Sequence, residues 1–164
     1  MKTKHNFRDY MFLTNEQAKK LMDMGMDLSK SSFINSKLIR TWDQKDVTSS
    51  NYSFMPNEGH IVMGFEQFDD VNTLSITEMF EMLPEMIYYK VNKYSYPASE
   101  ANEKSEFPFF MSFHKMKGKY YMSYDCQGYE GIVDSIEFTD KSLRNLLFKV
   151  IKWLFSNKLI KNED

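Results

Sequence analysis

The side chains with the clearest chemical potential lie in the C-terminal third of the sequence. Cys126 is the only cysteine, and His114, Asp125 and Asp134 lie near it in the chain. A thiol, an imidazole and a carboxylate are the groups of a nucleophile, a general base and the residue that orients the base. Only their mutual geometry makes such a set catalytic. We expect Cys126 in a loop beside a sheet edge and His114 on a wet strand face, so we predict no catalytic residue and no enzyme.

A metal site needs ligands that cluster. The three histidines are far apart in the sequence: His5, His60 and His114. Three acids lie close together but lack the pattern of a calcium-binding loop: Glu66, Asp69 and Asp70. We expect these acids to form a solvated turn, and we predict neither a metal nor another cofactor.

Two charged stripes are candidate interaction surfaces. The acidic stripe lies on a predicted helix and consists of Glu78, Glu81 and Glu85. The basic strip belongs to the C-terminal region and consists of Lys141, Lys149, Lys152, Lys158 and Lys161. An ordinary wet helix face explains the acidic stripe. The basic strip is suited to nucleic-acid phosphates, but lysines also serve solubility, so both interpretations stay open.

Tyrosines gather in the second half of the chain: Tyr88, Tyr89, Tyr94, Tyr96, Tyr120, Tyr121 and Tyr129. Tyrosine is enriched at protein interfaces because its ring tolerates both burial and exposure. It also fits well in strands, which is the alternative explanation.

Capping patterns predict the first two helices. Thr14 and Gln17 form a capping box, and Gly25 suits a left-handed C-terminal cap, so the first helix covers residues 15–24. Ser75 and Glu78 form a second capping box. Pro84 lacks an N–H group, so the second helix ends or kinks near Leu83.

A hairpin is the clearest element of the C-terminal block. Lys117-Gly118 predicts a two-residue turn, which places Met116 opposite Lys119. Pairing outward from this turn gives an oily face with these residues: Phe109, Met111, Phe113, Met122 and Tyr124. The other face is mostly polar and contains Phe110, Ser112, His114, Tyr121, Ser123 and Asp125. One packed and one wet face is typical of an antiparallel sheet.

A third strand over residues 132–138 precedes the last helix, which Thr139 or Asp140 caps and which runs to about Ser156, with Asn157 as its stop. Phe148, Phe155 and Trp153 widen its apolar arc to roughly 220°, against the ~100° that one buried face needs. We therefore expect this helix to pack on the sheet and to be covered elsewhere, by the second helix or by a second copy of the chain.

The remaining segments are less regular. Residues 32–42, 61–65 (interrupted at Gly64) and 88–96 are expected to be strands, and residues 43–60 a loop or a hairpin. The predicted fold is α+β, an antiparallel sheet of about four or five strands with amphipathic helices mainly on one face. We predict a single domain over residues 1–164, with mobile loops near residues 43–60 and 97–106.

Composition bounds the setting. The chain has 164 residues, of which 42% are hydrophobic, and a net charge of −2. Whole-chain charge therefore supports neither nucleic-acid nor membrane binding. A single cysteine fits a reducing compartment, and the polar start resembles no signal peptide. We expect no membrane span and a cytoplasmic location.

Three segments carry a resemblance: residues 13–21 (LTNEQAKKL), 74–84 (LSITEMFEMLP) and 142–154 (SLRNLLFKVIKWL). Together they resemble a group of small uncharacterised proteins encoded by gut Bacteroides and by their phages and mobile elements. The resemblance implies a setting, an accessory gene expressed in a bacterial cytoplasm, and it implies no activity and no functional residue.

Our leading functional prediction is a non-enzymatic protein–protein interaction protein of a phage or mobile element, with itself as one partner. Its interface candidates are Phe148, Trp153, Phe155, Tyr121 and His114. The alternative is a nucleic-acid-binding protein that uses the polar sheet face or a strip of lysines: Lys141, Lys149, Lys152 and Lys158. Neither a membrane nor a small-molecule partner is inferred.

Overall fold

A computed structural model describes residues 11–41, 43, 45–48, 50, 52–57, 67–90, 106–129 and 132–162, with the backbone alone at 127–129 and 132–133. The chain divides into two compact units. The first contains Met1–Phe80 and Asn162–Asp164, and the second contains Glu81–Lys161. The single domain over residues 1–164 stays a prediction.

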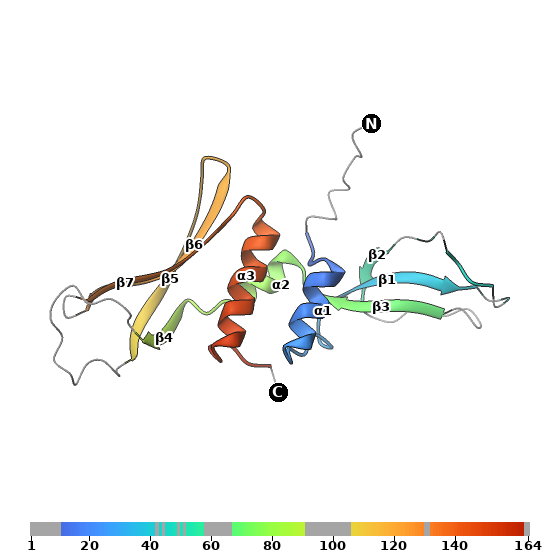
Figure 1. The fold of residues 1–164 in the computed structure, drawn as a ribbon, viewed down its shortest axis with the longest axis horizontal. Coiled ribbons are helices and arrows are strands. Elements are labelled where there is room, and N and C mark those ends of the chain that lie inside the picture. The colour runs from blue at the N-terminus through green and yellow to red at the C-terminus, as the bar shows by residue number, and fades with distance from the viewer. Residues whose placement is uncertain are drawn as a thin grey trace. The chain divides into compact units, whose positions relative to one another are not determined.

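The first unit combines two helices with a small sheet (Figure 1). Its elements are α1 (Asn15–Asp23), β1 (Phe33–Arg40), β2 (Ser53–Pro56), β3 (Gln67–Thr73) and most of α2 (Ile76–Glu81). The strands form an antiparallel sheet in the order β2-β1-β3. The ring of Phe12 joins β1 to β2, because it lies 4.9 Å from the ring of Phe33 and 4.5 Å from that of Phe54.

Both predicted capping boxes are confirmed. Thr14 Oγ1 accepts from the N–H of Gln17, and the Gln17 side chain accepts from the N–H of Thr14. Ser75 and Glu78 exchange the same two bonds at the start of α2. Gly25 follows α1 with a φ of +93°, in the left-handed region that the cap needs.

The second unit is a meander of four strands with one helix (Figure 1). Its elements are β4 (Met86–Lys90), β5 (Glu106–Met116), β6 (Lys119–Tyr129), β7 (Ile132–Asp140) and α3 (Leu143–Ser156). All neighbours are antiparallel, in the order β4-β5-β6-β7. The helix packs on β6 and β7, and its buried side chains are Leu146, Leu147, Val150, Ile151 and Leu154.

The hairpin prediction is confirmed with its register. Met116 pairs with Lys119, and pairing continues outward to Phe110 opposite Asp125. Lys117 and Gly118 have φ values of +49° and +74°, and positive φ at both central residues is the type I′ pattern that suits a two-residue hairpin turn. The α+β class and the antiparallel pairing are likewise confirmed, but the three-stranded sheet of the first unit was not predicted.

Several boundaries differ from the sequence predictions. Residues 43–60, predicted as a loop or a hairpin, contain β2, which pairs with β1. The second helix ends at Glu81 rather than near Leu83, and the strand predicted at residues 88–96 begins earlier, at Met86, with residues 91–96 outside the described part of the chain. Ser142, rather than Thr139 or Asp140, caps α3, because β7 continues until Asp140 pairs with Tyr120. The predicted strand at 61–65 and residues 97–105 of the second loop lie outside the described residues.

Candidate interaction surfaces

The four-stranded sheet has one face toward α3, here the inner face, and an opposite outer face. Alternation along the strands places Phe109, Met122 and Tyr124 on the inner face, where all three are buried. The Tyr124 hydroxyl donates to the carbonyl oxygen of Pro84 at 3.0 Å. Burial raises the pKa of Tyr124, so this hydroxyl keeps its proton. The inner face is therefore a packed core.

Cys126 lies on this inner face and not in a loop, which corrects the sequence prediction. It belongs to β6, pairs with Asp134 of β7 and is fully buried. Burial raises the pKa of the Cys126 thiol, and the nearby charge of Asp134 raises it further. Register places His114 and Asp125 on the outer face, so the sheet separates both from the thiol. The structure does not assemble the imagined catalytic set.

The outer face carries a polar network at its centre. The carboxylate of Asp125 accepts hydrogen bonds from Ser123 and Ser135 at 2.7 Å, and from Ser112 at 3.2 Å. Ser135 also approaches Glu137 at 3.4 Å. These contacts run across β5, β6 and β7, so they hold two carboxylates in place at the surface.

Apolar side chains lie beside this network. Met86 and Phe110 pair across β4 and β5, and Tyr88 stands two residues along β4. Their exposed fractions are 39% for Met86, 56% for Phe110 and 55% for Tyr88. Sequence analysis missed this group because it began the next strand at Tyr88, two residues after Met86. Pro84, which ends the second helix, was the signal that a strand could begin there.

The predicted interface residues divide between the two faces. The rings of His114 and Tyr121 stack on the outer face, with centroids 5.0 Å apart. Trp153 instead contacts Tyr89 and Phe138 on the inner side, at 5.2 and 5.7 Å. Phe148 and Phe155 are half-buried on α3. The structure thus brings together Tyr121 and His114, and part of the wide apolar arc of α3 packs within its own unit.

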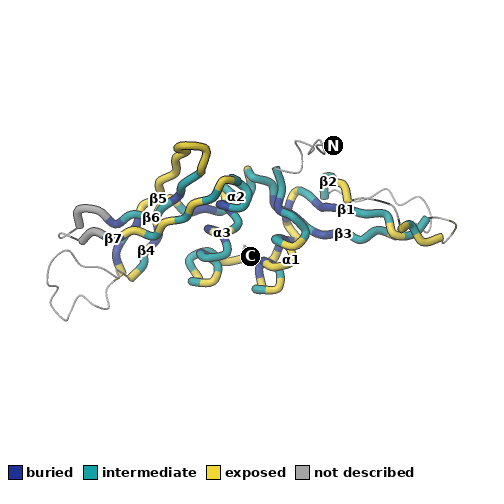
Figure 2. The backbone as a smooth tube through the Cα atoms, turned by 45° about the horizontal axis from the view of Figure 1, so that its top comes forward, coloured by how far each residue is buried: buried dark blue, intermediate teal, exposed yellow. Residues whose placement is uncertain are grey.

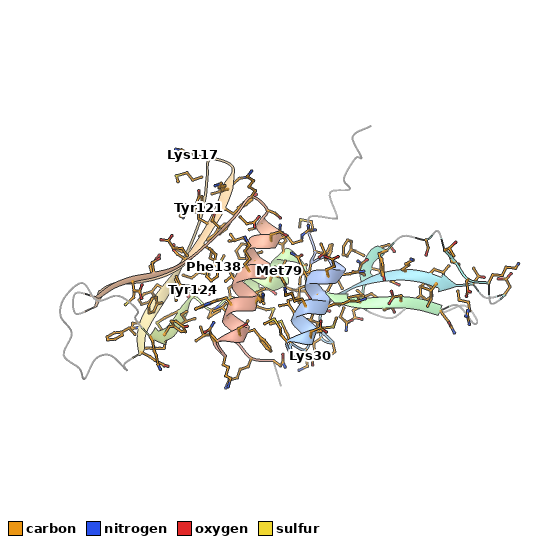
Figure 3. All side chains as sticks on the ribbon, viewed as in Figure 1. Lys30, Met79, Lys117, Tyr121, Tyr124 and Phe138 are labelled. Atoms are coloured by element: carbon orange, nitrogen blue, oxygen red, sulfur yellow. The ribbon has the colours of Figure 1, made fainter. Side chains whose placement is uncertain are left out.

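The end of the β5–β6 hairpin is exposed. Every residue from 112 to 119 is exposed, as Figure 2 shows in yellow, and Figure 3 labels Lys117 at the turn and Tyr121 further along β6. Between Phe107 and Tyr124 the sequence contains three lysines and no acid. The lysines are Lys115, Lys117 and Lys119. Sequence analysis missed this basic group, although the absence of acids was visible.

The predicted basic strip does not act as a single surface. Lys149 Nζ lies 2.7 Å from the Asp140 carboxylate and also donates to the Thr139 carbonyl oxygen. Burial alone would raise the pKa of Asp140, but Lys149 and the N–H of Ser142 outweigh it and lower that pKa. Lys141 follows Asp140 directly and therefore lies near the hairpin end. Lys152 is half-exposed on α3, and Lys158 and Lys161 follow the end of the helix.

The predicted acidic stripe is also broken up. Glu78 is occupied, because its carboxylate accepts from the backbone N–H groups of Ser32 at 2.7 Å and Ser75 at 2.8 Å. Glu85 lies beyond the end of α2. The sequence alone could not reveal the bond to Ser32, which is 46 residues away.

Within the described part of the chain, no group of three His, Cys, Asp or Glu residues is placed to hold a metal ion. Asp69 and Asp70 lie in β3 rather than in a turn, and His5, His60 and Glu66 are outside the described residues. None of the described helices combines the length and apolar character needed to cross a membrane.

Comparison with protein-family models, with curated proteins and with solved structures found no match. The resemblance to proteins of Bacteroides and their phages therefore stays a prediction, and the functional argument depends on the surfaces alone.

Proposed function

We propose that this chain is a non-enzymatic interaction protein that associates with a second copy of itself through the outer face. The observation that carries the proposal is the group of exposed apolar side chains, Met86, Tyr88 and Phe110, on one face of the sheet. Large apolar side chains that gather on a surface mark interaction sites more often than scattered ones do.

Charge favours a second copy as the occupant. On the outer face of β6, Lys119 lies at the hairpin end, and Tyr121, Ser123 and Asp125 follow it in this order. Consider a twofold axis in the interface plane that crosses the strands between the His114–Tyr121 pair and the Ser112–Ser123 pair. It places Lys119 over the second copy's Asp125, and Met116 over the second copy's Phe110. The same face thus offers both halves of each contact, as an isologous dimer requires.

The available area is at the low end for a specific interface. The four strands contain 5, 11, 11 and 9 residues, and at about 3.4 Å per residue and 4.8 Å between strands they give a face of roughly 590 Å². A stable interface buries about 800 Å² on each partner. Two such faces would pack as the two sheets of a sandwich do, about 10 Å apart.

A charge exchange tests the proposal. Lys119→Asp places two acids together in the dimer, and Asp125→Lys places two lysines together, so each variant should sediment as a monomer at concentrations where the wild type is a dimer. An equimolar mixture of the two variants restores both opposite-charge contacts and should restore the dimer. Sedimentation equilibrium measures all four samples, and circular dichroism verifies that each variant is folded.

A second pair of variants tests the apolar part. Phe110→Glu should dissociate the dimer, because Phe110 lies over the second copy's Met116, whereas Ile39→Glu in the first unit should not, although both side chains are exposed in the wild type. A monomeric wild type at every concentration, or a mixture of charge variants that stays monomeric, contradicts the proposal.

A further inference from the structure

The inner side of the hairpin end presents a second surface, separate from the outer face. Phe113 and Lys115 of β5 lie there with Tyr120 of β6. The rings of Phe113 and Tyr120 stack with centroids 6.3 Å apart and planes 10° from parallel. Lys115 Nζ lies 4.7 Å from the Tyr120 ring centroid and 3.2 Å from its hydroxyl. The fully buried part of β6 begins at Met122, so this group extends past the core.

Positive charge surrounds these rings. Lys115 and Lys117 belong to the hairpin, and Lys141 follows the end of β7, whose last residue, Asp140, pairs with Tyr120. β5 and β7 both neighbour β6, so with strands about 4.8 Å apart the backbones that carry these lysines lie within roughly 10 Å of each other across the sheet. The only acid at this register, Asp140, is already paired with Lys149 at 2.7 Å. A bound anion would therefore meet lysines and a neutralised carboxylate.

Rings and lysines in this combination match a specific ligand chemistry. Phosphate groups bind lysine ammonium groups, and unpaired bases stack on aromatic rings. A carboxylate-rich protein would use the lysines but leave the exposed ring of Phe113 unused. A duplex would also leave it unused, because its bases are already stacked. Phe113 is 41% exposed, which leaves ring surface for a base.

We infer that the inner side of the hairpin end binds single-stranded nucleic acid, with Phe113 and Tyr120 as the stacking platform and Lys115, Lys117 and Lys141 as phosphate contacts. This inference does not depend on self-association, because the dimer contacts lie on the outer face. It also assigns Lys141 to a surface other than the predicted basic strip.

Fluorescence anisotropy with a labelled 20-nucleotide oligo(dT) tests the inference. Three phosphate contacts predict that wild-type affinity falls about 20-fold between 50 and 200 mM salt. The double variant Lys115→Glu/Lys117→Glu should lose binding at 50 mM salt. The matched control, Lys19→Glu/Lys20→Glu, makes the same charge change on exposed residues of α1 and should retain binding. A wild type that does not bind at 50 mM salt, or equal loss in both double variants, overturns the inference.

Stacking is tested separately from charge. Phe113→Ala should weaken oligo(dT) binding by roughly fivefold or more, since one base–aromatic stack contributes at least that much. It should leave the binding of inorganic polyphosphate, which has charge but no bases, unchanged. A variant that binds both ligands as the wild type does, or a duplex of equal length that binds more tightly than the single strand, overturns the assignment to single-stranded nucleic acid. All of these variants should still form the dimer through the outer face, so the two proposals can fail independently of each other.

Discussion

Cys126 shows how position on a strand determines the reactivity of a side chain. Its thiol is fully buried against the core, and it pairs with Asp134 across the sheet. Both burial and the neighbouring carboxylate favour the neutral thiol, so its pKa is raised. A thiol with a raised pKa contains less of the reactive thiolate at any given pH.

We therefore expect native Cys126 to resist alkylation. At pH 8, iodoacetamide should modify it on the order of 100-fold more slowly in the native protein than in the urea-unfolded protein, because labelling requires opening of the fold. Mass spectrometry of timed samples measures both rates. Raising the pH above 8 should increase any labelling of the folded protein more than it would for a thiol of ordinary pKa, because the raised pKa shifts the formation of thiolate to higher pH. Rapid native labelling would mean that β6 opens readily at this position.

At the scale of the element, the hairpin turn explains why β5 and β6 pair in this register. Lys117 and Gly118 both have positive φ. This backbone conformation is unfavourable for residues that carry a side chain, asparagine being the most tolerant of them, and it is unstrained for glycine. Gly118→Ala should therefore lower the free energy of unfolding of the second unit by about 1 kcal/mol. A Cβ at Gly118 would meet no heavy atom within 4 Å, so the effect isolates the backbone.

Lys117→Asn is the matched control for this prediction, because Asn-Gly is the preferred pair in such a turn. It should leave the stability unchanged or raise it slightly. Urea unfolding monitored by circular dichroism compares the three proteins. Equal stability of Gly118→Ala and the wild type would show that the positive φ at Gly118 does not limit the stability of the turn.

The elements that could be predicted from the sequence are those with local causes. Capping boxes at Thr14 and Ser75, and the glycine turn at Gly118, act within a few residues, and each is found where it was expected. The β1–β2 pairing joins Ile34 to Met55 across a polar segment, and no local pattern announces it. The outer-face group was missed for the same reason, because Met86 meets Phe110 only through strand pairing.

At the scale of the whole molecule, the division into two units assigns one tryptophan to each. Trp42 lies in the sequence of the first unit, and Trp153 lies in α3 of the second. Leu146, a buried residue of α3, should therefore stabilise the unit whose unfolding Trp153 reports and not the unit whose unfolding Trp42 reports.

We expect Leu146→Ala to lower the free energy of unfolding reported by Trp153 by about 2–5 kcal/mol. The transition reported by Trp42 should stay in place. Trp42→Phe and Trp153→Phe backgrounds separate the two fluorescence signals in urea titrations, and Leu21→Ala in α1 should give the reverse result. Equal shifts of both signals would instead indicate one cooperative domain, as the sequence analysis predicted.

The side chain of Asn162 gives the first unit an unusual order of assembly. Its amide donates to the carbonyl oxygen of Gly25 at 2.9 Å, and its carbonyl oxygen accepts from the N–H of Asp27 at 2.7 Å. The second unit is thus inserted into the first along the chain, and these two contacts span 137 and 135 residues. During translation, the turn after α1 must wait for the ribosome to complete the whole insert before it acquires these bonds.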